Sequence, residues 1–141
     1  MREILFRGRT VSESEYLDDG EWIEGFYTRF NGDEHRIYTG YAETDCGDYY
    51  PDWFNVIPET VGQFTGLTDK HGKRIFEGDI IYMGLYPYVI KYDRENARYM
   101  FYTPRGNNKR DGFNAFTMET HEVIGNIHDN PELLEEREAE K

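Results

Sequence analysis

The segment GQFTGLTDKHGKRIFEGDII, residues 62–81, decides the fold that this sequence predicts. Its glycines stand among alternating apolar and polar residues, a pattern typical of short strands joined by tight turns. Gly72 can close one turn because it tolerates a positive φ, and Gly78 can do the same before a strand over Ile80–Met83. The Asp79 carboxylate can accept hydrogen bonds from backbone N–H groups in that second turn. We therefore expect Gly72, Gly78 and Asp79 to be structural turn residues.

Short runs rich in aromatic and β-branched residues continue this pattern on both sides of the segment. Turn signals separate them, among them Asp18-Asp19-Gly20 and Asn31-Gly32-Asp33. Residues 42–52 are predicted to be an acidic loop, and residues 104–112 a basic, glycine-rich loop. The sequence predicts strands at residues 2–9, 22–30, 36–41, 61–67, 73–76, 80–83, 89–92, 98–102, 113–118 and 121–127, and residues 53–57 are a short apolar run that ends at Pro58.

The number and spacing of these strands predict a mainly β fold, either a small β-barrel or a curled antiparallel sheet. A short C-terminal helix is expected over residues 131–141, since Pro131 stands at its start and acidic residues occupy its first turn. With 141 residues, the chain is long enough for one domain with its own core.

The charge of the chain is strongly negative and uneven. The formal net charge is −12, and residues 11–60 carry thirteen acids against two arginines. A field of this sign disfavours nonspecific binding to nucleic acid or anionic lipid; it can attract a basic partner or simply keep the chain in solution. The single cysteine, Cys46, favours a reducing, cytoplasmic setting. We expect no signal peptide and no membrane association, because the sequence contains no apolar run of the required length.

Three segments resemble the YopX family, whose members are encoded by phages and prophages, mostly of Gram-positive bacteria. PETVGQFTGLTDKHGKRIFEGDII at residues 58–81 is similar to the central signature of the family, and MREILFRGR at residues 1–9 is similar to its N-terminus. HEVIGNIHDNPELLEE at residues 121–136 is similar to its C-terminal signature. The resemblance implies a β-rich fold with an SH3-like barrel. It implies no established activity and assigns no catalytic residue.

The resemblance also suggests how a single YopX-like domain over residues 1–141 is organised. Residues 1–57 would form an acidic, β-rich half, which is the part expected to vary. Residues 58–130 would form the β-barrel half that carries the central signature. Residues 131–141 would form the C-terminal helix and tail.

We find no catalytic or metal-binding constellation in the sequence. The four histidines lack the spacing of metal ligands, and the residues around Cys46 offer too few Cys or His ligands for zinc. Negative neighbours also disfavour a reactive thiolate at Cys46. Ser12 and Ser14 stand in an acidic stretch without a base beside them, and no phosphate-binding or dinucleotide-binding glycine motif is present. We therefore expect no enzyme activity, no cofactor and no metal.

The acidic half predicts a docking surface for an unidentified protein, with a basic partner as the best chemical match. Aromatic rings can supply buried area while neighbouring carboxylates steer and select a cationic partner. Burial in the protein's own core is the competing interpretation for Trp53, and a homo-oligomer stays open. The candidate partner-binding residues are Asp45, Asp48, Tyr49, Tyr50, Asp52 and Trp53.

Two alternatives stay open. One is a small β-barrel that binds nucleic acid through two basic turns, with Tyr99, Phe101 and Tyr102 between them in sequence, because basic grooves with stacked rings bind single strands. The same charges could instead balance the acidic half, and the rings could be core. The other alternative is an enzyme whose site the sequence does not reveal. The candidate nucleic-acid-binding residues are Lys70, Lys73, Arg74, Arg105, Lys109 and Arg110.

Overall fold

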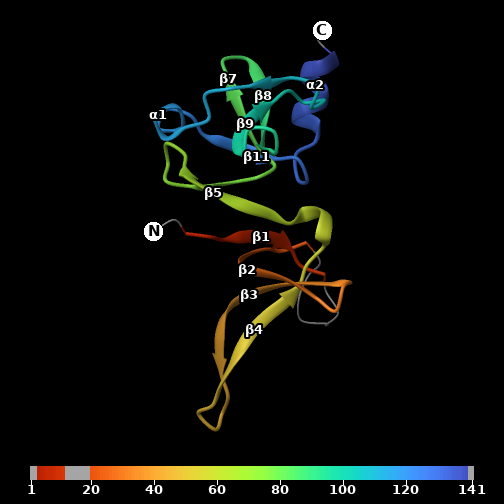
Figure 1. Ribbon diagram of the computed structural model, residues 1–141, viewed down its shortest axis with the longest axis vertical. Helices are drawn as coiled ribbons and strands as arrows, with labels where there is room; N and C mark the ends of the chain where they lie inside the picture. Colours follow the sequence, from red (N-terminus) through yellow and green to blue (C-terminus); the bar gives the residue numbers. More distant parts are fainter. Residues whose placement is uncertain (1–2, 12–19, 140–141) are drawn as a thin grey trace. The chain divides into compact units, whose positions relative to one another are not determined.

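The computed structural model describes residues 3–11 and 20–139 and shows a mainly β chain (Figure 1). All strand pairings among these residues are antiparallel, and the helices are short, so the predicted mainly β fold is confirmed. The chain divides into two compact units, Met1–Gln63 and Phe64–Lys141. Asp18 and Asp19 of the first predicted hairpin signal lie outside the described residues.

The first unit is an antiparallel sheet in the order β4-β3-β2-β1, and β1 pairs in turn with the first residues of β5. Ile37 and Val56 are buried in it, and a Cβ placed on Gly8 would lie 3.2 Å from side-chain atoms of both. The missing side chain of Gly8 therefore lets β1 approach this small core closely. The elements of this part of the chain are β1 (Phe6–Arg9), β2 (Trp22–Phe30), β3 (Glu34–Glu43), β4 (Tyr49–Asn55), the 3-10 turn η1 (Pro58–Thr60) and β5 (Gly62–Thr68).

Strands β3 and β4 form a long hairpin where the sequence predicted an acidic loop. That prediction is wrong, because β3 continues to Glu43 and β4 begins at Tyr49, so that only residues 44–48 are left for the turn. Tyr49 pairs with Glu43, and two residues further along β4, Pro51 pairs with Tyr41. Rings on both strands stabilise such a ladder, and here they outweigh the loop-like acidic composition.

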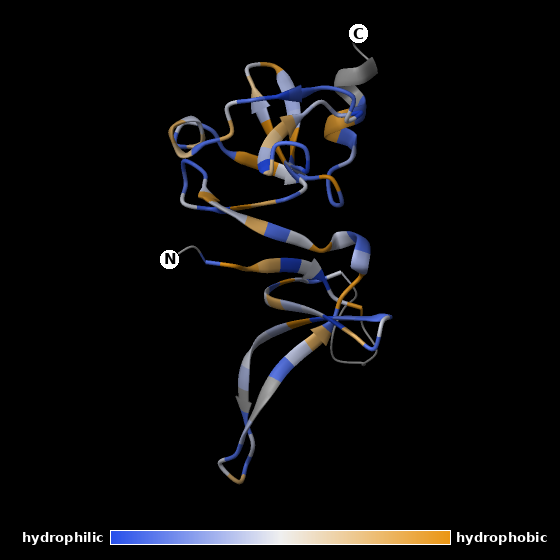
Figure 2. Cartoon of the chain, viewed as in Figure 1, coloured by the Kyte–Doolittle hydropathy of each residue, from blue (hydrophilic) through white to orange (hydrophobic). Residues whose placement is uncertain are grey.

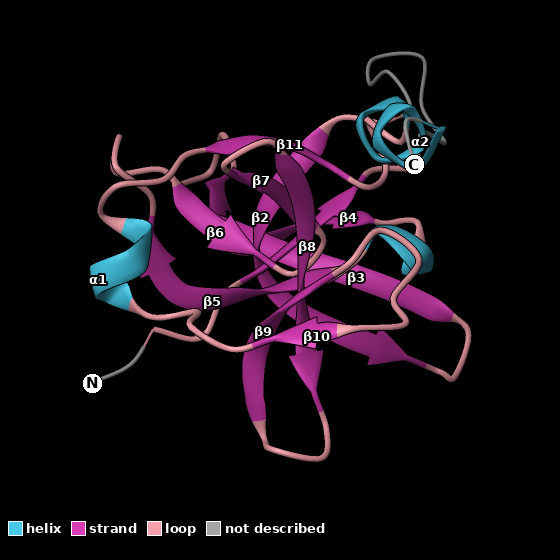
Figure 3. Cartoon of the chain, turned by 90° about the horizontal axis from the view of Figure 1, so that it is seen from above, coloured by secondary structure: helices cyan, strands magenta, loops and turns pink. Residues whose placement is uncertain are grey.

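The second unit contains an open five-stranded sheet in the order β10-β9-β8-β7-β11 (Figure 3). Because β10 and β11 are its two edges, the strands in the described part of the chain do not close into a barrel. Separately, β5 pairs with β6 through Phe64 with Phe76 and Thr68 with Arg74. The remaining elements are β6 (Arg74–Phe76), β7 (Asp79–Met83), β8 (Tyr86–Asp93), β9 (Arg98–Tyr102), β10 (Lys109–Arg110), α1 (Ala115–Met118), β11 (Val123–Asn126) and α2 (Glu132–Ala139).

The core of the second unit is built from apolar side chains of several strands. The apolar segments of these strands are orange in Figure 2. Phe113 meets Phe101 edge to face, with ring centroids 5.6 Å apart, and so covers the core beside β9. Burying one such large apolar side chain stabilises a fold by roughly 1.5–3 kcal/mol, so this cluster is a main source of stability. The fully buried members are Ile75, Ile81, Ile90, Phe101 and Met118.

The prediction of a strand at residues 113–118 is wrong, because helix α1 occupies most of this segment. Asn114 has an extended backbone, and its side chain accepts a hydrogen bond from the Thr117 amide at 2.9 Å. A side-chain cap of this kind satisfies a free N–H group of the first helical turn and so starts a helix. The helix places Met118 in the core.

The two turns of the segment at residues 62–81 are built around glycines and aspartates. Gly72 and Gly78 have φ values of 78° and 89°, which few residues with a side chain adopt. The Gly78 amide donates to the Ile90 carbonyl at 2.8 Å, and the Asp79 carboxylate accepts from the Phe76 amide at 2.8 Å. The second turn is therefore held to β8 as well as to itself.

A third turn, at residues 126–130, leads into α2 and is organised by two asparagines. The side-chain oxygen of Asn126 accepts from the amides of His128 and Asp129, each at 2.9 Å. The side-chain oxygen of Asn130 accepts from the Asn126 amide at 3.2 Å. These bonds explain the role of the GNIHDN segment in shaping the backbone.

None of the helices in the described ranges is long and apolar enough to cross a membrane.

Candidate docking surface

One face of the β2–β3–β4 sheet carries six of the ten aromatic side chains that the structure describes in the first unit. Residues opposite each other in an antiparallel pair project to the same face, as do residues two apart on one strand. Phe26 is opposite Tyr38, and Tyr38 is opposite Trp53, so one row of rings crosses three strands. Further along the hairpin, Tyr41 and Tyr49 fall on the same face by this register.

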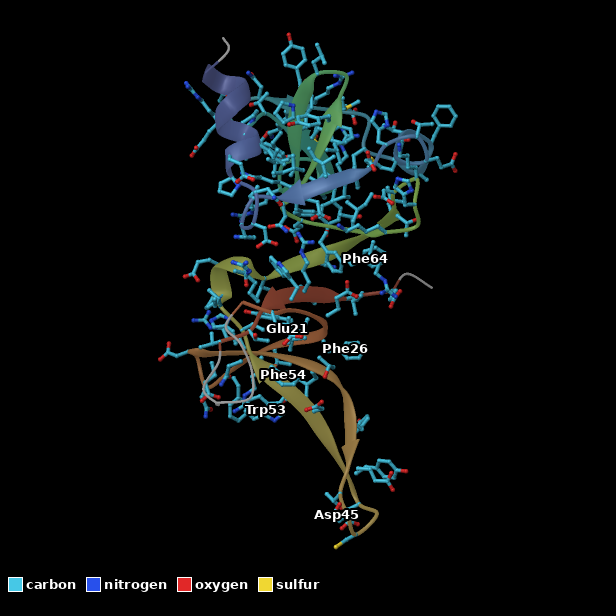
Figure 4. All side chains as sticks on the ribbon, turned by 180° about the vertical axis from the view of Figure 1, so that it is seen from behind. Glu21, Phe26, Asp45, Trp53, Phe54 and Phe64 are labelled. Atoms are coloured by element: carbon cyan, nitrogen blue, oxygen red, sulfur yellow. The ribbon has the colours of Figure 1, made fainter. Side chains whose placement is uncertain are left out.

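This aromatic face, defined as Phe26, Phe30, Tyr38, Tyr41, Tyr49 and Trp53, is largely uncovered. A monomeric protein seldom leaves so many large rings on one surface unless that surface binds something. The five most exposed rings of this face are Tyr41 at 77%, Tyr49 at 71%, Phe26 at 68%, Phe30 at 46% and Trp53 at 38%. Figure 4 shows Phe26 and Trp53 nearer the base of the β3–β4 hairpin and Asp45 at its tip.

Arg36 holds two of these rings in place. Its guanidinium lies 3.8 Å from the centroid of the Trp53 ring and 4.4 Å from that of Phe30. The same group pairs with the Glu34 carboxylate at 2.6 Å. Hydrogen bonding to Tyr38, together with Glu34, raises the pKa of Arg36, so the cation is permanent. The rings are therefore preordered, which lowers the entropic cost of docking.

Acidic side chains lie at the far end of the hairpin that carries this face. Asp45 and Asp48 are exposed in the turn, which is closed by a hydrogen bond from the Thr44 amide to the Asp48 carbonyl at 2.8 Å. Asp52 is half-buried. Its side chain projects from the face of β4 opposite to that of Trp53, because neighbouring residues of a strand point to opposite faces. Counted over the sequence, residues 1–63 carry a net charge of −9, so the unit has a strongly negative field.

Five of the six predicted partner-binding residues fall into three groups. Tyr49 and Trp53 share the aromatic face, Asp45 and Asp48 lie in the hairpin turn, and Asp52 projects from the other face. Tyr50 lies in β4, and its side chain is outside what the structure describes. Trp53 is not a core residue, since it lies on the open face against Arg36.

Sequence reasoning missed Phe26, Phe30 and Tyr41 as members of this surface. The signal was the spacing Phe26-Thr28-Phe30, which puts two rings on one face of a strand. That spacing cannot tell a solvent-facing row from a buried one. Only the register with β3 and β4 shows that the rings are exposed and adjacent.

The six predicted nucleic-acid-binding residues lie in the second unit, and several already contact other side chains. Lys109 pairs with Asp93 at 2.8 Å and with Glu95 at 3.2 Å. The Arg110 guanidinium lies 5.7 Å from the Tyr88 ring centroid, and that of Arg74 lies 5.9 Å from the Phe64 ring centroid. Lys70, Lys73 and Arg105 are exposed. Of the rings between the basic turns, Phe101 is fully buried, whereas Tyr99 and Tyr102 are half-buried.

The pair of Asp93 and Lys109 anchors β10 to the β8–β9 turn. A hydrogen bond from Lys109, with a second from the Asn96 side chain, lowers the pKa of Asp93 from 3.8 to about 2. The same bond raises the pKa of Lys109. The charge of Lys109 is therefore largely compensated by carboxylates within the protein.

Within the described ranges, no group of three or more His, Cys, Asp or Glu side chains is placed to hold a metal ion.

Comparison with known proteins places the chain in a family. The family model described as YopX protein matches residues 10–135. The chain belongs to the YopX family. The match covers the aromatic face, both glycine turns and the asparagine turn before α2, so these features lie within the family domain.

A solved structure shares this fold. It is the crystal structure of protein EF1440 from Enterococcus faecalis, which is 24% identical in sequence with a TM-score of 0.63. The similarity covers 95% of this YopX-family chain and 99% of that chain. At this identity the likeness shows the fold alone. No curated protein matches the sequence significantly.

Proposed function

We propose that this YopX-family protein is a non-catalytic interaction module that docks a basic protein partner on the aromatic face of its first unit. The observation that carries the proposal is the row of exposed rings across β2, β3 and β4, with Arg36 fixed between Phe30 and Trp53. Preordered aromatic groups of this kind are the residues that dominate binding energy in protein interfaces.

The charge of the unit supports a basic partner. The carboxylates of Asp45, Asp48 and Asp52 lie on the hairpin that carries the rings, where they can steer a cationic surface toward them. The phage or prophage origin and the cytoplasmic location implied by the sequence remain part of this proposal. So does an SH3-like character of the second unit, which its antiparallel sheet and tight Gly78 turn support.

Nucleic acid is the weaker candidate. The basic turns that would bind it contain Lys109 and Arg110. The charged group of Lys109 lies against Asp93, and that of Arg110 lies against the Tyr88 ring. The negative field of the chain adds an unfavourable term for any phosphate backbone.

The test is affinity capture from bacterial lysate, with and without nuclease treatment, on the immobilised full chain. The aromatic variant combines Phe26→Ser, Tyr41→Ser and Tyr49→Ser, and the charge variant combines Asp45→Asn, Asp48→Asn and Asp52→Asn. The matched control is Phe116→Ser, which removes a ring that is 82% exposed in the second unit. Circular dichroism and the melting temperature check that every variant is folded.

We expect the wild type and Phe116→Ser to retain the same protein, and the aromatic variant to lose it. The charge variant should associate more slowly, and added salt should slow the wild type, because exposed charges are screened beyond about 8 Å at physiological ionic strength. Capture that ignores the aromatic substitutions would refute the proposal. Retention that is lost on nuclease treatment and depends on Lys73, Arg74 and Arg105 would favour the nucleic-acid alternative instead.

A further inference from the structure

At the C-terminal end of β4, the outer edge of the chain already forms an isolated antiparallel bridge. The amide of Val11 donates to the Asn55 carbonyl at 2.9 Å, and the amide of Ile57 donates to the Arg9 carbonyl at 2.8 Å. Residues 9–11 thus lie antiparallel to residues 55–57, with a bridge between Thr10 and Val56. The chain itself shows that this edge supports strand addition.

These bonds also show which backbone groups face outward. Asn55 and Ile57 bond away from β3, whereas the intervening Val56 amide donates to the His35 carbonyl at 2.9 Å, on the β3 side. Backbone groups alternate along a strand, so Tyr49, Pro51 and Trp53 should face the outer edge as Asn55 does. A hydrogen bond from the Thr39 hydroxyl to the Asp52 carbonyl at 3.4 Å agrees with this phase.

Pro51 fits the outward position, because a proline has no N–H group to donate to β3 and is tolerated where its nitrogen faces an open edge. Strand β4 is the last strand of its sheet among the described residues. The outer edge over residues 49–53 therefore offers the Tyr49 and Trp53 amides as donors and the carbonyls of Tyr49, Pro51 and Trp53 as acceptors.

We propose that the occupant of the docking surface is an extended, lysine- or arginine-rich peptide segment that adds to β4 as an antiparallel strand. This inference rests on the proposed function and specifies its partner. The bound peptide would lie in line with residues 9–11 along the outer edge of β4, and its backbone would pair with Tyr49, Pro51 and Trp53. Addition of a strand to a sheet edge is a general mode of peptide recognition, in which alternate side chains give specificity.

The two faces of β4 specify the two sets of partner side chains. Partner residues opposite Tyr49, Pro51 and Trp53 lie on the aromatic face, which favours β-branched or other apolar side chains. The partner residues between them lie on the side of Asp52, where a Lys or Arg is directly opposite a carboxylate. The net charge of −9 over residues 1–63 favours cations at these positions and disfavours acids.

The experiment measures binding of the full chain to a synthetic heptapeptide in which Val or Thr alternates with Lys, capped at both ends. Calorimetry gives the Kd, and the tryptophan fluorescence of Trp22→Phe, which retains Trp53 alone, reports a change at Trp53. Two N-methylated series distinguish strand addition from simple charge attraction. One series methylates the amides of the Val and Thr residues, and the other methylates those of the Lys residues.

We expect methylation at Val and Thr to weaken binding by about tenfold or more, because these amides point at β4 and each lost hydrogen bond is costly. Methylation at Lys should change Kd by less than about threefold, because those amides point away. A peptide with Glu in place of Lys should not bind. Phe116→Ser should bind as the wild type does, and the Phe26→Ser, Tyr41→Ser, Tyr49→Ser variant should bind more weakly.

Equal effects of the two methylated series, or no saturable binding of the Lys peptide, would overturn strand addition. These outcomes leave the proposed function to be decided by the capture experiment, which uses no peptide. If the methylated series differ as expected but the aromatic variant binds normally, the edge is used without the aromatic face, and the assignment of partner side chains to that face is wrong.

Discussion

The Val123 amide donates a hydrogen bond of 3.0 Å to the carboxylate of Asp69, 54 residues earlier in the chain. The other carboxylate oxygen of Asp69 accepts from the amides of His71 and Lys73, at 2.9 and 3.0 Å. One buried side chain therefore closes its own turn and ties that turn to the strand β11. The bond joins two of the three segments in which the sequence resembles the YopX family.

Substitution of Asp69 should be strongly destabilising. Burial by itself would raise the pKa of Asp69, but the three backbone donors lower it below its usual value, so the folded state prefers the charged carboxylate. Asp69→Asn removes the acceptor for the Val123 amide and should cost about 1–3 kcal/mol of unfolding free energy. Asp69→Ala leaves all three donors without an acceptor and should cost more. Urea unfolding measures both.

The control for Asp69 is Glu122→Gln. Glu122 pairs with His71 at 3.0 Å, but both side chains are about half exposed, so the change should stay within about 0.5 kcal/mol. If Asp69→Asn were as mild as this control, the Asp69 carboxylate would not organise the turn.

The contribution of Asp93 to stability should depend on pH in a defined window. Its pKa is about 2 in the folded protein against 3.8 for an ordinary Asp, chiefly because Lys109 donates to it. Between these values the unfolded chain binds more protons than the folded one, so stability falls as the pH decreases from about 4 to about 2. Asp93→Asn should be less stable than the wild type at pH 7, and this difference should shrink through the same window.

Urea unfolding of the wild type and Asp93→Asn from pH 7 to pH 2 measures this dependence. Asp111→Asn is the matched control, because Asp111 is exposed and pairs with the exposed Arg98 at 3.1 Å. A difference between the wild type and Asp93→Asn that is constant over the whole range would contradict the assignment of the low pKa to the Lys109 contact.

Gly125 and Asn130 should be energetically coupled. A Cβ on Gly125 would lie only 2.7 Å from Asn130 Cγ, so Gly125→Ala should displace the Asn130 side chain from the Asn126 amide. Overpacking of this kind costs about 1–3 kcal/mol. Asn130→Ala removes the Cγ and Oδ1 atoms and leaves only the Cβ contact at 3.0 Å, so the double variant should be more stable than the sum of the single effects predicts, by about 0.5–3 kcal/mol. Strict additivity in a double-mutant cycle would show that the two residues are independent.

Gly78→Val should destabilise the protein because of backbone strain. The φ of Gly78 is 89°, and a Cβ there would be 3.5 Å from the Ile127 side chain, an ordinary contact, so space is not the obstacle. A β-branched residue held at positive φ should cost about 1–3 kcal/mol. Gly78→Asn should cost less, since Asn tolerates positive φ better. An unchanged melting temperature for Gly78→Val would refute this account of the turn.

Local patterns predicted several elements well. The strands Trp22–Phe30 and Arg98–Tyr102 have the bounds that alternation and flanking turn signals predicted. The same reasoning failed at residues 113–118, because the Asn114 cap starts a helix, and at residues 42–52, because Tyr41 and Tyr49 support a long hairpin. In both places a specific side-chain interaction outweighed the average tendency of the composition.

The residues of the candidate docking surface show a second limit. Tyr49 and Trp53 were predicted from aromatic rings beside acids, but Phe26, Phe30 and Tyr41 could not be, because a ring in an alternating strand can face either core or solvent. Lys109 was one of the candidate residues of the nucleic-acid alternative, and the structure places it against Asp93, which is 16 residues away in the chain.

The sequence by itself determined the family, the mainly β class and the places where the chain must turn, because Gly, Asn and Asp select backbone angles through interactions within a few residues. The tertiary structure alone decided which side chains share a face and which strand edge is left without a neighbour among the described residues. The register between β2, β3 and β4 brings Phe26, Tyr38 and Trp53 into one row, and a shift by one residue would move each of them to the opposite face. That register depends on contacts along the whole sheet, which no local pattern contains.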